Sequence, residues 1–290
     1  MPKIAILGAN GFLGFPISNA FEAKDWEVIA FSHTKKPALL RQEFLVDLFD
    51  EASLKLALSQ ARPDVVLSTA WDTEHGKFWT NESNVGYRDA TLRFAELSFE
   101  AGAETFISLG TMSEYGTSPG LCNADVTPLI INDIYSKSKI ETGVELKKIG
   151  EAFGRQTHWA RVFQAFGPNE KSERFIPGLI AKLQNGTEFS IRTPNFEMDW
   201  IHTADVASAI VFMLENRLNH FVDIGTGIGT TVRELSELIC EEFDLDPTLL
   251  DYSGQILGHE KKAVVDRRTQ LLSLGWRPTE SLRNRVKSLR

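Results

Sequence analysis

The sequence is poor in metal ligands and in long apolar runs. Its two cysteines, Cys122 and Cys240, cannot form a disulfide framework or a four-ligand metal site, and its six histidines show no HxH or HxxxH spacing. No segment approaches the ~20 apolar residues of a membrane span, and the apolar run before Gly8 is too short for a signal peptide. We therefore expect a cytoplasmic protein with no structural metal and no membrane partner.

Positive charge is also scarce. Lys and Arg total 31 against 39 Asp and Glu, a formal net charge of -8, which disfavours nucleic acid as a partner. The sequence has no repeats or low-complexity tracts, and 42% of its 290 residues are hydrophobic. This composition predicts a globular protein with a large domain and room for a smaller one.

The first motif is a glycine-rich turn near the start. Residues 3–7 form a short apolar run, and the glycines that follow lead into a helical pattern. Such a strand, turn and helix bring the backbone and a helix amino terminus close to a pyrophosphate. We predict that the turn binds a dinucleotide through Gly8, Asn10, Gly11, Phe12, Leu13 and Gly14.

The second predicted strand, 26–31, is followed by the run SHTKK instead of the usual acid, and the next carboxylate is Glu43. A hydroxyl with two lysines suits a 2′-phosphate better than a free 2′-hydroxyl, so we expect NADP(H) in preference to NAD(H), which stays possible. The alternative is a solvated loop that is merely basic. The residues expected to contact the cofactor here are Ser32, His33, Lys35 and Lys36.

Further apolar runs alternate with helical patterns. Predicted strands at 44–47, 63–70, 104–109 and 157–163 are separated by predicted helices at 50–61, 80–101 and 133–153. Six strands in this arrangement predict an α/β fold with a doubly wound parallel sheet, a Rossmann domain over residues 1–167. Ligands bind at the carboxyl edge of such sheets, where we expect Asp47, Leu48, Ala70, Trp71 and Phe163. Trp71 could equally be a packing residue in a loop.

Beyond residue 167 the pattern loosens. Shorter helices and strands alternate to the end of the chain, and they predict a smaller α/β substrate lobe over 168–290 that is interleaved with the last elements of the main sheet. We expect this lobe to cover the cofactor edge and to supply the substrate pocket.

Tyr135 and Lys139 lie four residues apart after Asp133, a plausible helix N-cap. This spacing places both side chains on one helix face. An ammonium beside a phenol favours the phenolate, and so lowers the tyrosine pKa toward the range of a general acid or base. Such pairs also occur by chance on surface helices, so the rest of the chain decides their meaning.

Several motifs occur together in a recognisable order. They are Gly8/Gly11/Gly14, Thr111 with Tyr115-Gly116, Tyr135-xxx-Lys139, the run ARVFQAFGP ending at Pro168, DWIHTADVA from Asp199, and LGWRP ending at Pro278. Over nearly its whole length the chain resembles the extended short-chain dehydrogenase/reductases of the NAD-dependent epimerase/dehydratase type. The resemblance implies an enzyme in which Tyr135 exchanges a proton with the substrate oxygen and Thr111 hydrogen-bonds that oxygen. It further implies that Lys139 lowers the tyrosine pKa and holds the nicotinamide ribose.

Asn84 looks like the helix asparagine that, in relatives, supports a water between the lysine and solvent; alternatively, it is only a polar residue near a helix start. The paired helices 80–101 and 133–153 resemble the dimer interface of the family, which implies a homodimer.

The residues after Thr111 separate the reactions of the family. Related dehydratases carry an Asp-Glu pair there, but this chain has Met112 and Ser113, so dehydration is unlikely and ketone reduction or hydride-return epimerisation is left. The basic loop favours an NADPH-dependent reductase of a 4-keto(-6-deoxy) nucleotide sugar. The alternatives are an NAD-dependent nucleotide-sugar C4 epimerase and, from another class, an NADP-sensing or scaffold protein on the same fold.

The substrate itself is less defined. Met198 replaces an arginine that commonly contacts the diphosphate in nucleotide-sugar enzymes, so a non-nucleotide carbonyl substrate stays open. The candidate substrate-binding residues are Thr111, Ser113, Asn169, Arg174 and Arg192.

Overall fold

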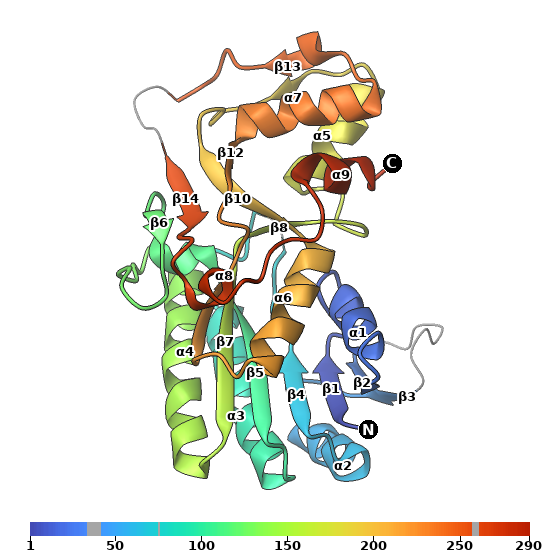
Figure 1. The fold of residues 1–290 in the computed structure, drawn as a ribbon, viewed down its shortest axis with the longest axis vertical. Coiled ribbons are helices and arrows are strands. Elements are labelled where there is room, and N and C mark those ends of the chain that lie inside the picture. The colour runs from blue at the N-terminus through green and yellow to red at the C-terminus, as the bar shows by residue number, and fades with distance from the viewer. Residues whose placement is uncertain (34–41, 75, 257–260) are drawn as a thin grey trace.

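A computed structural model describes residues 1–290 except 34–41, 75 and 257–260. Within those residues the main sheet has seven parallel strands in the order β11-β7-β5-β4-β1-β2-β3 (Figure 1). The strands are β1 (Lys3–Leu7), β2 (Glu27–Ser32), β3 (Gln42–Leu45), β4 (Val65–Ser68), β5 (Thr105–Thr111), β7 (Gln156–Val162) and β11 (Phe221–Ile224). The predicted doubly wound parallel sheet is confirmed.

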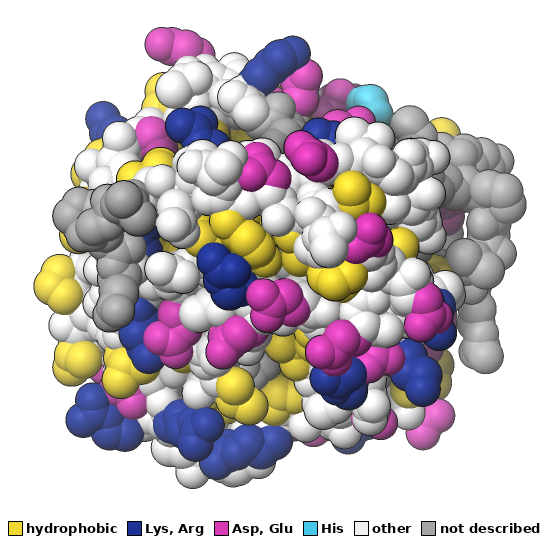
Figure 2. All heavy atoms as spheres, turned by 90° about the horizontal axis from the view of Figure 1, so that it is seen from above, with side chains coloured by type: hydrophobic (Ala, Val, Ile, Leu, Met, Phe, Trp, Pro, Cys, Tyr) yellow, Lys and Arg dark blue, Asp and Glu magenta, His cyan; other side chains and the backbone are white. Residues whose placement is uncertain are grey.

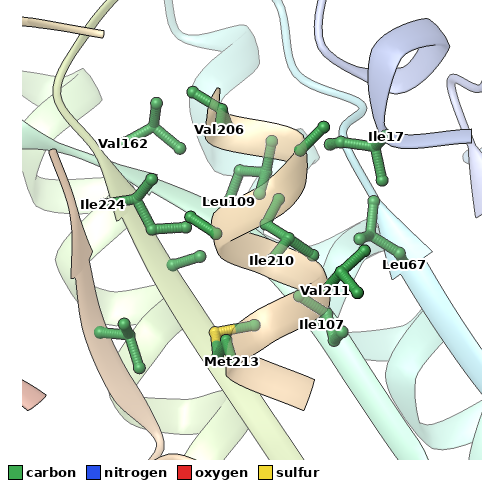
Figure 3. Packing of buried hydrophobic residues seen from close by; sticks show 14 of the residues in the cluster. Ile17, Leu67, Ile107, Leu109, Val162, Val206, Ile210, Val211, Met213 and Ile224 are labelled. Atoms are coloured by element: carbon green, nitrogen blue, oxygen red, sulfur yellow. The ribbon is translucent and has the colours of Figure 1, made fainter. Parts of the chain in front are cut away.

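Helices cover both faces of this sheet, which is why its strands are apolar on both sides. One face carries α1 (Gly14–Glu22) and α6 (Thr203–Glu215), and the other carries α2 (Glu51–Ala61), α3 (Ser83–Glu100) and α4 (Ile134–Phe153). Figure 3 shows the first of these layers, where Val206, Ile210, Val211 and Met213 of α6 pack against strand residues such as Ile107. Fully burying an aliphatic side chain contributes about 1.5–3 kcal/mol, so this layer fixes α6 on the sheet.

A smaller lobe lies beyond the carboxyl edge of the sheet (Figure 1). Its sheet joins β12 (Gly229–Thr231), β10 (Glu197–His202), β14 (Lys262–Val265) and β6 (Gly120–Cys122), and β8 (Gln164–Phe166) pairs with β10. The other lobe elements are α5 (Phe175–Gln184), α7 (Val232–Phe243), α9 (Leu282–Lys287), the strand pair β9 (Phe189–Ser190) and β13 (Leu250–Asp251), and η2 (Pro247–Leu249). Two short helices, η1 (Met112–Tyr115) and α8 (Gln270–Ser273), complete the chain.

The chain crosses between the two sheets several times. β6 and β8 precede residue 168 and belong to the lobe sheet, whereas β11 follows it and pairs with β7 in the main sheet, with Val222 opposite Ala160. The expected interleaving is therefore visible, while a domain boundary at 167/168 stays a prediction.

Three element predictions need correction. The main sheet has seven strands among the described residues, not six, because β11 joins its edge. The strand predicted at 44–47 is β3 at Gln42–Leu45, so Asp47 lies beyond its end. The helix predicted from residue 80 begins at Ser83, whose backbone N–H donates to Asn81 Oδ1 at 3.0 Å and so ends the preceding turn.

The face seen in Figure 2, over the lobe, carries acidic and basic side chains interspersed with hydrophobic ones. In the part of the chain that the structure describes, no helix is both long and apolar enough to cross a bilayer.

Candidate active site

A cavity of about 880 Å³ lies between the carboxyl edge of the main sheet and the lobe. This volume lies in the range of clefts that bind cofactors and other small molecules. The predicted residues that line it are Gly8, Gly11, Phe12, Leu13, Ala70, Trp71, Thr111, Ser113, Tyr135, Phe163 and Arg174. The fold therefore brings nine of the expected cofactor-binding and catalytic residues to one cleft.

The glycine turn connects β1 to α1 as predicted. Gly8 has φ +85°, and a β-carbon at Gly14 would overlap the Gly8 carbonyl oxygen, so side chains are excluded at both positions. The Gly11 N–H donates to Gly8 O at 2.8 Å and closes the turn. The resulting bare backbone faces the cavity beside the amino terminus of α1, which fits a dinucleotide pyrophosphate.

The corner beside the turn holds an acid that the sequence did not place there. The Asn10 side-chain amide donates to Ser32 Oγ at 3.0 Å and to Glu43 Oε1 at 3.1 Å. Glu43 comes from β3, which pairs in parallel with β2, so its carboxylate reaches the end of β2 from the neighbouring strand. The expectation that this corner lacks a carboxylate is wrong.

The other residues predicted for this corner lie at its edge. His33 Nδ1 is 3.9 Å from Asp47 Oδ2 on the surface, and Leu48 is buried beneath. These two side chains and Asp47 do not line the cavity in the described structure. Lys35 and Lys36, the basis of the NADP(H) expectation, lie outside the described residues.

Tyr135 and Lys139 lie in the first turns of α4. Asp133 caps this helix as predicted, since its side chain accepts from the Ser136 N–H at 2.7 Å. The Thr111 side chain, at the end of β5, lies close enough to the Tyr135 hydroxyl to act on its pKa. The strand and the helix thus bring together the hydroxyl pair that the sequence predicted.

The electrostatics of the pair differ from the expectation. Burial raises the pKa of Tyr135 above its usual value, and the nearby Thr111 side chain opposes this only in part. Burial lowers the pKa of Lys139 to about 7. The Lys139 ammonium is 5.9 Å from the Tyr135 ring centre, and burial is the largest influence on the tyrosine pKa. The expected net direction of the Tyr135 pKa is therefore wrong for this structure, because burial raises it, while a lowering influence of Lys139 stays a prediction.

Lys139 is instead held by its other neighbours. Its Nζ donates to Leu109 O at 2.9 Å and lies 3.5 Å from the centre of the Trp71 ring. The Trp71 Nε1–H donates to Asn84 Oδ1 at 2.7 Å, and the Asn84 amide donates to Phe78 O and to Asn81 O, each at 2.7 Å. Asn84 is fully buried and reaches the site through Trp71, so it does not line the cavity where a water relay would run.

The substrate end of the cavity is lined by aromatic and charged groups. The rings of Phe78 and Trp79 pack edge-on against Tyr135, with centroids 4.8 and 5.4 Å away. The Arg174 guanidinium donates to Thr73 O at 3.0 Å and lies 5.6 Å from the Phe78 ring centre. Two apolar rings therefore pack against the Tyr135 ring, and the Arg174 cation lies beside one of them.

Two predicted substrate residues lie elsewhere. Arg192 and Asn169 are exposed and do not belong to the cavity lining of the described structure, although Asn169 turns the chain with φ +63°. The turn brings in Glu170, which sequence reasoning missed. Its backbone N–H donates to Gly167 O at 3.3 Å, and its side chain lines the cavity, where burial raises the pKa of the carboxyl to about 7. A left-handed asparagine after Gly-Pro is the local signal that could have found it.

No metal site accompanies these groups. Among the described residues, no cluster of His, Cys, Asp or Glu has the arrangement to hold a metal ion.

Known proteins resemble this chain over its full length. The model of the NAD dependent epimerase/dehydratase family matches residues 4–225. The dTDP-6-deoxy-L-talose 4-dehydrogenase (NAD(P)(+)) of Kitasatospora kifunensis is 25% identical over 99% of this chain and 94% of its own. A low-salt glycan biosynthesis protein of Haloferax volcanii is 23% identical over 65% of this chain, and the match spans 61% of that protein.

Solved structures of related enzymes share the fold. The crystal structure of dTDP-glucose 4,6-dehydratase from Bacillus anthracis, in complex with NAD, superposes with a TM-score of 0.84 at 17% identity, over 100% of this chain and 95% of that one. Together with the match of the family model to most of the sequence, the glycine turn and the Thr111–Tyr135–Lys139 cluster give one conclusion. The chain belongs to the NAD dependent epimerase/dehydratase family and is an NAD(P)-dependent enzyme of the extended short-chain dehydrogenase/reductase type.

Proposed function

We propose that this enzyme is an NADPH-dependent reductase that converts a 4-keto(-6-deoxy) nucleotide sugar into the corresponding alcohol. The observation that carries the proposal is that Thr111 and Tyr135 both line the cavity and lie close together, while Met112 and Ser113 after Thr111 are unsuited to proton transfer. A ketone oxygen placed between two hydroxyl donors is the geometry that stabilises a developing alkoxide.

The backbone of the turn at Gly8, Gly11 and Leu13 would hold a nicotinamide cofactor, which when bound would supply the hydride that the carbonyl carbon accepts. The Thr111 hydroxyl donates a hydrogen bond to the carbonyl oxygen, and Tyr135 gives that oxygen its proton as the C–O double bond becomes single. Because burial raises its pKa, Tyr135 is protonated at neutral pH and suited to act as an acid. Lys139 lies beside it as the ammonium that balances the tyrosinate left behind, and it loses this charge above its pKa of about 7.

The two positions after Thr111 offer no acid or base for dehydration. Met112 and Ser113 follow Thr111 in η1 and both line the cavity, where a dehydratase needs groups that protonate a leaving hydroxyl and remove a carbon-bound proton. A thioether cannot transfer a proton, and a serine at its ordinary pKa is a poor acid or base. Reduction needs neither group.

The substrate class is supported by charge and by relatives. Arg174, Lys171 and Lys261 line the same cavity as Met198, so they are the cations that could hold a diphosphate in place of the missing arginine. The full-length relative from Kitasatospora kifunensis is named for the interconversion of a 4-keto and a 4-hydroxy nucleotide sugar. A panel of 4-keto-6-deoxy nucleotide sugars with NADPH, followed by loss of absorbance of the reduced cofactor, tests the class. The absence of turnover with every member would refute it.

The second part of the proposal is the preference for NADPH over NADH. Lys35 and Lys36 favour the 2′-phosphate of NADPH, while the Glu43 carboxylate beside Asn10 and Ser32 favours the free ribose hydroxyl of NADH. The two lysines carry more positive charge than the Glu43 carboxylate carries negative charge, so we propose that the enzyme prefers NADPH to NADH. Fluorescence titration with both reduced cofactors decides it, and tighter binding of NADH would reverse the assignment.

Glu43 is also the observation that favours the second candidate, an NAD-dependent C4 epimerase, because such an enzyme returns the hydride and keeps its NAD. An epimerase converts a nucleotide sugar with no net change in NADPH. Product analysis by NMR after incubation with UDP-glucose and NAD, without reduced cofactor, separates it from the reductase.

We propose further that the enzyme is a cytoplasmic homodimer. The two free cysteines are buried and form no disulfide, which suits a reducing compartment. The outer face of α4 exposes Val144 and Phe153, by 38% and 42%, next to α3, and a second copy would cover them. Analytical ultracentrifugation tests the dimer.

A further inference from the structure

Directly behind Thr111 lies a carboxylate that the reaction described above does not use. Glu114, in η1, is fully buried. Its Oε1 accepts from the Thr111 backbone N–H at 2.9 Å and from Trp159 Nε1–H at 3.0 Å, and its Oε2 accepts from Arg161 Nε–H at 2.6 Å. Three donors from β5 and β7 therefore converge on one side chain.

Trp159 extends this contact from the sheet to α4. Its indole is wedged between Gly110 of β5 and Gly143 of α4, since a β-carbon at Gly143 would lie 2.9 Å from the indole ring. A β-carbon at Gly110 would likewise lie 2.6 Å from Glu114 Oε1. The strand that ends in the catalytic hydroxyl and the helix that carries the catalytic pair are therefore spaced by one indole, and that indole is fixed by Glu114.

The charged groups around Glu114 come from three further elements. Arg161 of β7 forms the ion pair, α4 presents Tyr135 and Lys139, and β11 presents Asp223, which accepts from Tyr115 at 2.7 Å. Burial is the main cause of the low pKa of Lys139, and the negative charge of Glu114 opposes it. The same charge adds to burial in raising the pKa of Tyr135.

We propose that Glu114 is a positioning residue of the active site, which fixes the Thr111 backbone, sets the spacing of β5 and α4 through Trp159, and places a fixed negative charge behind the Lys139 ammonium. The inference rests on the proposed oxidoreductase function. Stability alone gives little reason for the Glu114–Arg161 pair, because replacing a buried ion pair by apolar side chains is often neutral or stabilising. A role in aligning Thr111 and in placing a negative charge near Lys139 explains why the ion pair is present.

The test is E114Q, with R161K as its matched control, in the full-length protein with cofactor. E114Q removes the negative charge and keeps the shape, so the alkaline limb of the reduction rate against pH should move to lower pH by about half a unit or more. Its kcat should fall about tenfold because Thr111 loses its fixed position. R161K keeps both charges of the ion pair, so the alkaline limb of its pH–rate profile should stay at the wild-type pH even if kcat declines.

Two results would overturn the proposal. One is an E114Q protein whose kcat and alkaline pH limb both match those of the wild type. The other is an R161K protein whose limb moves as far as that of E114Q, because the effect would then come from packing and not from charge. If E114Q does not fold, W159F carries the test: it keeps the ion pair and removes one donor to Glu114, and an unchanged kcat in W159F would contradict the positioning role.

A measurement without substrate separates this inference from the proposed function. NMR titration of protein labelled at lysine Nζ should show the Lys139 midpoint near 7 in the wild type and lower in E114Q. If no keto sugar is reduced but the midpoint still moves, the proposed substrate is wrong and the role of Glu114 stands. If the sugar is reduced and the midpoint does not move, the role of Glu114 is wrong.

Discussion

The Lys139 ammonium lies 3.5 Å from the centre of the Trp71 indole ring, and that ring is held in turn by Asn84. A cation over a tryptophan face contributes about 1 kcal/mol, more when desolvated. We expect W71L to lower kcat about fivefold, because Lys139 loses the surface that holds it beside Tyr135.

W71F is the control for this prediction, since it keeps an aromatic face and loses only the N–H to Asn84. Its kcat should stay within about twofold of the wild type. Steady-state kinetics, with thermal unfolding to verify folding, measure both variants. Equal activity of W71L and the wild type would show that the ring does not hold the lysine.

The low pKa of Lys139 predicts a pH-dependent cost of stability. Burial holds this pKa near 7, below the ordinary lysine value of 10.5, so the unfolded state binds more protons between these limits. Stability from this group therefore rises with pH through that window and is lowest below pH 7. K139M removes the buried charge, so its gain in melting temperature over the wild type should be larger at pH 6 than at pH 9. A gain that is the same at both pH values would contradict a buried, titrating Lys139.

Much of the site could be predicted from local sequence. Short-range sequence patterns were enough to predict three features: the glycine turn, the Asp133 cap, and the shared helix face of Tyr135 and Lys139. Each depends only on residues that are close together in the chain. Trp71 was predicted at the cavity edge because a parallel strand ends just before it.

The missed contacts join segments that lie far apart in the sequence. Glu43 reaches Asn10 across 33 residues and Arg161 reaches Glu114 across 47, and each contact depends on the order and register of neighbouring strands. The sequence likewise predicted that the lobe interleaves with the main sheet, but not that β11 is the strand that returns to it. Tyrosine and lysine pKa values depend on burial, which only the assembled fold supplies, so the predicted direction for Tyr135 was wrong.

Glu43 should discriminate between the two cofactors. E43Q keeps an oxygen to accept from Asn10 and removes the charge that repels a 2′-phosphate, so NADPH should bind up to about tenfold more tightly. NADH should bind more weakly, because a charged acceptor for its ribose hydroxyl is lost. Fluorescence titration of both variants gives the two dissociation constants. An unchanged ratio would mean that the Glu43 carboxylate does not face the ribose.

Glu170 should act on the substrate and not on the chemistry. Its carboxylate faces the cavity and can accept from a sugar hydroxyl, and a hydrogen bond to a charged group contributes about 1.5 kcal/mol or more. E170Q should raise KM about tenfold at pH 8 and leave kcat nearly unchanged.

The pKa of about 7 gives this prediction a second readout. Wild-type KM should rise as the pH falls through 7 and the carboxylate gains a proton, whereas KM of E170Q should not change with pH in this range. A fall in kcat with KM unchanged would place Glu170 in the chemical step instead.

Tyr135 as the proton donor in NAD(P)H-dependent ketone reduction is the central claim. Y135F keeps the ring among Phe78 and Trp79 and removes only the hydroxyl. The most direct measurement is the rate of NADPH oxidation by Y135F with a 4-keto sugar that the wild type reduces, alongside the affinity for NADPH. We predict a rate at least about 100-fold lower with unchanged NADPH affinity. A Y135F protein that reduces the sugar at the wild-type rate would contradict the claim.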